Sequence, residues 1–187
     1  MTPLNTLSLA HDFVQKHVPA GGFCIDATAG RGGDTLFLSK LVGPEGRVLA
    51  FDIQQAAVDI TKSRLEEAGC TNAQVVLDSH ANMGNYAQPG TVDAILFNFG
   101  YLPGGDHSIY TRAESSIAAI EAGLELLKPN AVMSLCIYHG GDNGDEEKEA
   151  LLRYFRTIDS KQYTVLVTEF ANRPNDPPIP VFILKRT

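Results

Sequence analysis

The sequence lacks the features of a membrane, secreted or disulfide-bonded protein. None of its 187 residues lie in an apolar run of about 18 or more, so a membrane-spanning helix is excluded. The first residues, MTPLNTLSLAHDF, have neither a basic segment nor a long apolar core, so we expect no secretory signal. The three cysteines, Cys24, Cys70 and Cys136, have no CxxC spacing, which argues against a disulfide framework or a zinc site. We therefore expect a cytoplasmic protein without a metal site.

Positive charge is also scarce. The formal net charge is −7, and the 15 Lys and Arg residues are scattered, without a block of five like charges. An acidic protein does not attract nucleic-acid phosphates non-specifically. We expect neither DNA nor a membrane as a partner, and any contact with RNA would have to be local.

Short β-branched runs alternate with longer helical stretches, which is typical of a parallel α/β sheet. There is no repeat, low-complexity tract or Ser-rich linker, so we expect one domain over residues 1–187. The last two strands have only an Asn- and Pro-rich turn between them, too short for a parallel crossover. The pattern predicts a Rossmann-like, seven-stranded, mostly parallel sheet with an antiparallel last strand and helices on both faces. The expected strands are 23–27, 47–51, 73–77, 92–97, 131–138, 163–170 and 180–185, and the expected helices are 4–18, 35–41, 56–67, a short one near 82, 115–127 and 146–158.

The strongest local signal is the glycine turn DATAGRGGDT, residues 26–35, between the first strand and a helix. Its glycines permit positive φ angles and a close approach of a ligand to the backbone. A P-loop would need GK[ST], and the dinucleotide fingerprint fails because Thr35 stands at its third glycine position. Asp26 would repel a pyrophosphate but favour a ligand with an ammonium and a sulfonium. This combination indicates S-adenosylmethionine (SAM).

Acidic residues also end the next two strands. Asp52 is placed to accept hydrogen bonds from ribose hydroxyls, and Asp78 lies where an adenine amino group would be. Other interpretations stay open: the glycines form only a tight turn, Asp34 is an ordinary helix N-cap, or Asp78 caps the short helix after it. The expected cofactor site comprises Asp26, Thr28, Gly30, Gly32, Asp34, Thr35, Asp52, Gln54, Asp78, Ser79, His80 and Asn98.

The substrate is expected at the end of the fourth strand, in the sequence NFGYLPGGD. Asn98 resembles the first residue of the Asn/Asp-Pro-Pro-Tyr motif of methyltransferases that act on amino groups, and its amide oxygen would accept an amine N–H. Tyr101 would pack on a flat base, and His139 would accept a proton. The catalytic prediction is thus Asn98, Tyr101 and His139. Alternatively, Asn98 shapes a turn, Tyr101 fills the core and His139 is structural; for His11, packing competes with an approach to the cofactor.

The segments DATAGRGGDT, DSHANM, NFGYLPGGD, SIAAIEAGLELL and NRPNDPP together are similar to a family of small SAM-dependent methyltransferases known as rRNA methylases. The resemblance covers nearly the full chain. It implies methylation of the amine of 5-aminomethyl-2-thiouridine at the tRNA wobble position, contact with the anticodon stem-loop, and a homodimer. Arg31-Gly32-Gly33 departs from the expected Asn-Gly and a larger residue but keeps the key glycines. The alternatives are a ribosomal RNA or small-amine acceptor, a non-catalytic SAM- or RNA-binding module, and an NAD-dependent oxidoreductase.

Overall fold

The computed structural model describes residues 4–99, 113–139, 144–174 and 176–187. Its strands are β1 (Phe23–Asp26), β2 (Arg47–Asp52), β3 (Ala73–Leu77), β4 (Val92–Phe99), β5 (Leu127–Ile137), β6 (Tyr163–Val167) and β7 (Ile179–Lys185). Its helices are α1 (Thr6–Val14), α2 (Gly33–Val42), α3 (Gln55–Glu67), the short 3-10 helix η1 (His80–Asn85), α4 (Ala113–Leu126) and α5 (Gly144–Phe155).

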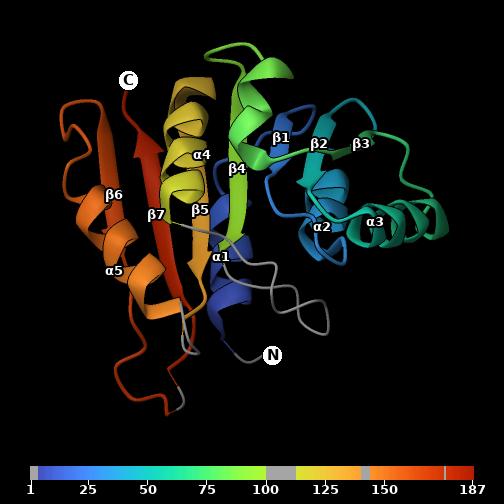
Figure 1. The fold of residues 1–187 in the computed structure, drawn as a ribbon. Coiled ribbons are helices and arrows are strands. Elements are labelled where there is room, and N and C mark those ends of the chain that lie inside the picture. The colour runs from blue at the N-terminus through green and yellow to red at the C-terminus, as the bar shows by residue number, and fades with distance from the viewer. Residues whose placement is uncertain (1–3, 100–112, 140–143, 175) are drawn as a thin grey trace.

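The strands form one sheet in the order β3-β2-β1-β4-β5-β7-β6 (Figure 1). Strand β7 is antiparallel to both of its neighbours, and the pairs from β3 to β5 are parallel. Helices α1 and α2 pack on one face, with α3 beside α2, while η1, α4 and α5 cover the other face. The predicted seven-stranded sheet with an antiparallel last strand is confirmed. The strand order reverses between β1 and β4, and this is where open α/β sheets bind ligands.

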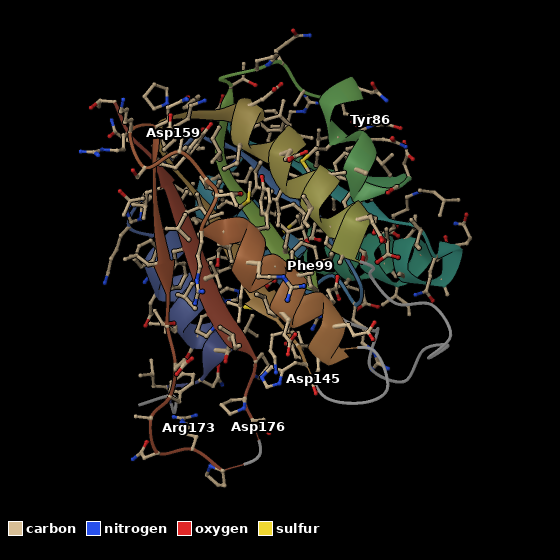
Figure 2. The ribbon with its side chains drawn as sticks, turned by 60° about the vertical axis from the view of Figure 1, so that its left-hand side comes forward. Tyr86, Phe99, Asp145, Asp159, Arg173 and Asp176 are labelled. Carbon is tan, nitrogen blue, oxygen red and sulfur yellow. The ribbon has the colours of Figure 1, made fainter. Side chains whose placement is uncertain are left out.

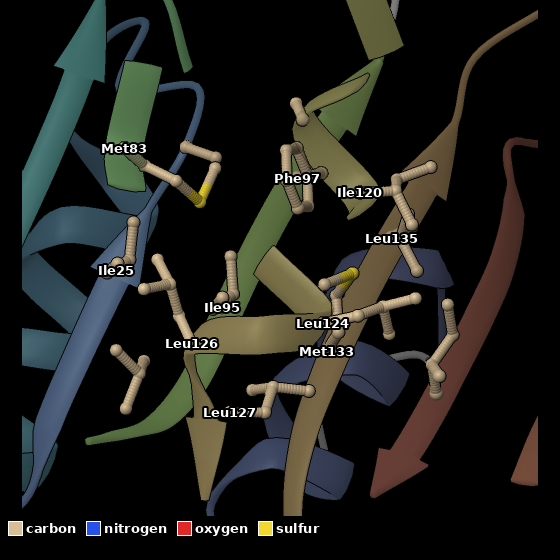
Figure 3. Packing of buried hydrophobic residues seen from close by; sticks show 14 of the residues in the cluster. Ile25, Met83, Ile95, Phe97, Ile120, Leu124, Leu126, Leu127, Met133 and Leu135 are labelled. Carbon is tan, nitrogen blue, oxygen red and sulfur yellow. The ribbon is translucent and has the colours of Figure 1, made fainter. Parts of the chain in front are cut away.

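The larger hydrophobic core lies between the sheet and the layer formed by η1, α4 and α5. Figure 3 shows its centre, where Ile95 and Met133 of the sheet face Ile120 and Leu124 of α4. Gly123 of α4 lies between these layers. A Cβ at this position would meet the Met133 Cε at 2.6 Å and the Ile95 Cδ1 at 3.1 Å. A side chain at position 123 would therefore displace the flexible ends of Met133 and Ile95.

Strand β5 begins four residues earlier than the sequence predicts. Leu127 already pairs with Val92, and the register shifts before Ala94 pairs with Val132. Asn130 in the shifted segment has φ 66°, a value that is uncommon for a residue other than glycine. The irregularity explains the difference: helix α4 ends at Leu126, and the chain enters the sheet at Leu127, before the hydrophobic run that starts at Ala131.

The cysteines occupy two different environments. Cys24 and Cys136 are buried in the sheet, and burial raises the pKa of each thiol to about 12. Cys70 is partly exposed in the turn between α3 and β3, at the amino-terminal edge of the parallel strands. All three are free thiols. In the described parts of the chain, no helix has the length and apolar character needed to cross a membrane.

Candidate active site

Most of the predicted site residues lie at or just after the carboxyl ends of strands β1, β2, β3 and β4, which share one edge of the sheet. In Figure 2 this edge lies toward the bottom, where Asp145, at the start of α5, lies near Arg173 and Asp176 of the β6–β7 connection. Asp159, which precedes β6, lies at the opposite end. The topology therefore brings residues that are distant in sequence to the same edge.

Asp26 lies beneath the glycine turn and is completely buried. Its Oδ1 accepts the Thr28 N–H at 3.1 Å, and its Oδ2 accepts the Thr35 hydroxyl at 2.6 Å. Burial raises the pKa of Asp26 to about 7, and the nearby carboxylate of Asp34 adds to the shift. Thr35 is also completely buried. Neither side chain is exposed in this arrangement, so both residues stabilise the turn from beneath.

Asp52 holds the turn from the neighbouring strand. Its Oδ2 accepts the Gly30 N–H and its Oδ1 accepts the Gln54 N–H, each at 2.9 Å. A carboxylate has about four lone-pair positions, so each oxygen keeps one for a further donor. Asp52 is only partly buried, and the next residue, Ile53, is 60% exposed. The end of β2 therefore places the free acceptor positions of Asp52 next to the exposed apolar side chain of Ile53.

Gly32 begins helix α2 as its N-cap, with φ 74° and ψ 17°. A Cβ on Gly32 would meet Thr61 of α3 at 3.0–3.1 Å. Both the left-handed backbone and the close packing of α3 therefore account for a glycine here. The alternative in which Asp34 is the N-cap is wrong, because that place belongs to Gly32 and no side chain caps the helix.

Asp78 is the centre of a small polar cluster after β3. Its Oδ1 accepts the Ser79 N–H and an Asn82 amide hydrogen, both at 2.7 Å, and its Oδ2 accepts the Tyr86 hydroxyl at 2.8 Å. These three hydrogen bonds lower the pKa of Asp78, and the bond from Asn82 contributes most to the shift. The N-cap of η1 is Ser79, whose hydroxyl accepts the Ala81 N–H, so the alternative of Asp78 as the cap is wrong.

His80 lies against the end of β1. Its Nδ1 is 3.2 Å from the Ala27 carbonyl oxygen, which can only accept, so the hydrogen belongs on Nδ1. Its ring makes edge-to-face pairs with Phe97 and Phe99. Burial lowers the pKa of His80, which keeps the imidazole neutral. A fixed neutral tautomer leaves Nε2 as an acceptor.

Asn98 joins the end of β4 to the glycine turn. Its N–H donates to the Thr28 hydroxyl oxygen at 2.8 Å, and its side-chain Nδ2 donates to Asp34 Oδ2 at 2.7 Å. The other oxygen of Asp34 lies 2.7 Å from Nε2 of His11. The structure thus brings Asn98 to the predicted cofactor turn, while Tyr101 lies outside the described residues.

His139 has a different neighbour. It follows β5, and its Nδ1 lies 3.9 Å from a carboxylate oxygen of Asp145 in α5, a separation that is an ion pair only when the imidazole is protonated. Its side chain is 11% exposed. Among the described contacts, this histidine is not part of the group around Asn98. Within the described ranges, no set of three or more His, Cys, Asp or Glu side chains is placed to hold a metal ion.

The pairing of His11 with Asp34 is not predicted by the sequence. The two side chains come from different helices, and neither spacing nor composition could have indicated their contact. Ile53 was also not predicted, although its position carried a signal: an apolar residue lies between the polar residues Asp52 and Gln54, directly after a buried strand. In the structure its side chain is exposed, where packing does not require an apolar residue.

Known proteins of similar sequence and structure identify the class. A "putative methyltransferase" from Streptococcus mutans, solved in complex with S-adenosylhomocysteine (SAH), is 33% identical with a TM-score of 0.88, over 97% of this chain and 98% of that one. A "putative rRNA-methylase" from Clostridium thermocellum is 42% identical with a TM-score of 0.95, over 99% and 100% of the two chains. The fold and the site define a class I SAM-dependent methyltransferase.

The particular family follows from the sequence. The profile of the family described as "Putative rRNA methylase" matches residues 48–184, and this chain belongs to that family. A chloroplastic tRNA (mnm(5)s(2)U34)-methyltransferase of Arabidopsis thaliana is 33% identical over 188 residues, which cover 95% of this chain and 68% of that protein. The resemblance expected from the sequence is confirmed, and SAM is the cofactor. Membership of this family argues against the alternative of a nicotinamide oxidoreductase.

Proposed function

We propose that this protein methylates the primary amine of 5-aminomethyl-2-thiouridine at the wobble position of tRNA. The product is 5-methylaminomethyl-2-thiouridine. The observation that carries the proposal is the pair of hydrogen bonds from Asn98, its backbone N–H to the Thr28 hydroxyl and its side-chain Nδ2 to Asp34, which holds an amide side chain beside the glycine turn. The Arabidopsis relative, a tRNA (mnm(5)s(2)U34)-methyltransferase that is similar to nearly all of this chain, supports tRNA as the substrate.

The residues of the turn fit SAM. Asp52 has one acceptor position left on each oxygen, which matches two ribose hydroxyls, and Ile53 offers an apolar face to the base. Gln54, Ser79 and the neutral His80 line the neighbouring strand ends, and one remaining position on Asp78 suits an adenine amino group. Gly30 has φ 53° and, with Gly32, gives the backbone its sharp turn. Asp26, Thr35 and Asp34 would support this site from behind.

When bound, SAM supplies a methyl group on a positively charged sulfur, so the amine lone pair forms the C–N bond as the C–S bond breaks. The protein then has mainly to position the amine. The Asn98 amide oxygen accepts one amine hydrogen and directs the lone pair toward the methyl group. Partial desolvation favours the neutral amine, and its extra proton leaves to solvent or to a base such as His139.

Labelled SAM and tRNA that lacks only this methyl group test the proposal. The label should appear at the wobble uridine, and nuclease fragments of the product would locate it. Label confined to ribosomal RNA, or no transfer to either RNA, would reject the proposed substrate. The proposal includes a homodimer, and sedimentation at the mass of one chain of 20.2 kDa would reject that part.

Removing the amide side chain tests the role of Asn98. We expect Asn98→Ala to lower kcat by about 100-fold, because misplacing a reacting group by about 1 Å has an effect of that size. The Kd for SAM, measured by calorimetry, should change by less than about threefold, since most proposed cofactor contacts come from other strands. An unchanged kcat would remove Asn98 from the reaction.

A further inference from the structure

Three side chains from separate elements form a hydrogen-bond network on the face of the sheet that α1 and α2 cover. We call it the Asn98–Asp34–His11 network. Asn98 at the end of β4 donates its Nδ2–H to Asp34 Oδ2 at 2.7 Å. Asp34 Oδ1 is in turn 2.7 Å from His11 Nε2 of α1. Asp34 is 8% exposed, so both of its oxygens are engaged in a largely buried position. The Asn98–Asp34–His11 network joins the carboxyl end of β4 to helix α1.

The Asn98–Asp34–His11 network determines which way the Asn98 amide faces. An ionised carboxylate only accepts hydrogen bonds, so the NH₂ group of Asn98, and not its oxygen, must face Asp34. The amide oxygen is then directed away from Asp34 and stays available as an acceptor. Without an acceptor at position 34, the two orientations of the amide would no longer be distinguished by this contact.

His11 fixes the carboxylate from its other side. Because the carboxylate accepts, the hydrogen of this contact belongs to His11 Nε2. The imidazole also stacks on Phe37, with a centroid distance of 3.7 Å and an interplanar angle of 3°. Phe37 and Asp34 both belong to α2, one turn apart, so the same helix sets the ring plane of His11 and the position of the carboxylate.

We propose that Asp34 is a positioning residue for methyl transfer, which, supported by His11, holds the Asn98 amide with its oxygen toward the substrate amine. The proposal rests on the proposed function of Asn98. It differs from a role in cofactor binding in what it requires of residue 34. Positioning needs a hydrogen-bond acceptor, whereas attraction of a positively charged methyl donor needs a negative charge.

Asparagine separates the two requirements. In Asp34→Asn the new amide oxygen can still accept from Asn98, and its NH₂ can donate to Nε2 of the other His11 tautomer. We expect Asp34→Ala to lower kcat by about 10- to 100-fold, and Asp34→Asn to retain kcat within about fivefold of the wild type. The Kd for SAM should stay within about threefold in both. Asp59→Ala, on an exposed position of α3, is the matched control and should behave as wild type.

A compensating pair keeps the test decisive if Asp34→Ala does not fold. Asn98→Asp places two carboxylates against each other and should lose most of kcat. Adding Asp34→Asn restores one donor between the two positions and leaves an oxygen of residue 98 for the amine. The double variant should recover at least about tenfold in kcat over Asn98→Asp.

The outcomes are distinguishable. A wild-type enzyme that transfers no methyl group to the wobble uridine rejects the proposed function. An active wild type with an unchanged kcat in Asp34→Ala, or no recovery in the double variant, overturns the positioning role alone. Equal weakening of SAM binding in Asp34→Ala and Asp34→Asn, with kcat unchanged, would assign the charge of Asp34 to the cofactor instead.

Discussion

The proposed contact between Asp52 and the cofactor ribose gives a prediction whose size follows from the free acceptor positions of this carboxylate. Asp52 already accepts two backbone N–H bonds and keeps one acceptor position on each oxygen. Hydrogen bonds to a charged group contribute about 1.5–3 kcal/mol each, and the partial exposure of Asp52 favours the lower value. Two such bonds give about 3 kcal/mol, so Asp52→Ala should raise the Kd for SAH by about 100-fold.

The assay must separate the ribose contact from the support of the turn, because Asp52→Ala also removes the acceptor of the Gly30 and Gln54 N–H groups. Calorimetry with SAH and with its 2′,3′-dideoxy analogue makes this separation. The wild type should bind SAH about 100-fold more tightly than the analogue, and Asp52→Ala should bind both with similar weak affinity. If Asp52→Ala weakens both ligands by the same factor, the residue supports the turn and does not contact the ribose.

Two further predictions concern stability, and urea unfolding followed by circular dichroism measures both. Gly46→Ala should lower the free energy of unfolding by about 1–3 kcal/mol, because the new Cβ would lie 2.4 Å from the Val42 Cβ and 2.8 Å from the Gly22 carbonyl oxygen, and neither atom can shift without moving the backbone. The matched control Gly84→Ala has nothing within 4 Å of the new Cβ, and an equal loss there would contradict the packing argument. Asp26→Asn should change how stability depends on pH. Since the folded pKa of Asp26 is raised to about 7, ionisation opposes folding, and the wild type should lose up to about 4 kcal/mol relative to Asp26→Asn between about pH 4 and pH 7. Parallel pH profiles of the two proteins would refute the raised pKa.

The fold was largely predictable because its signals are local and repeated. Each buried run of β-branched residues is followed by a helical period, and the missing crossover before β7 determined its direction. The boundaries failed where a non-local contact decides them. The start of β5 depends on Leu127 pairing with Val92, and the shifted segment also lets Lys128 reach the buried carboxylate of Asp93 at 2.8 Å. No local pattern contains that pairing.

For the site, the sequence indicated which residues gather at the carboxyl edge but not how they contact one another. Asp34 was a plausible helix cap by residue type, yet α2 begins at a left-handed glycine, which leaves the carboxylate free to bridge α1 and β4. Its partners are 23 residues before it and 64 residues after it. Contacts over such separations follow from the packing of α1 on the sheet, which the spacing of residues does not encode.

The different environments of the three thiols make the native chain suitable for labelling at one position. At neutral pH a maleimide dye reacts with thiolate, which the raised pKa values suppress at Cys24 and Cys136, while Cys70 is accessible. A fluorophore on Cys70 would lie at the amino-terminal edge of the strands, opposite the carboxyl edge where we propose that the cofactor and the RNA bind. Energy transfer from that dye to a labelled oligonucleotide would then follow association in real time, without any engineered cysteine.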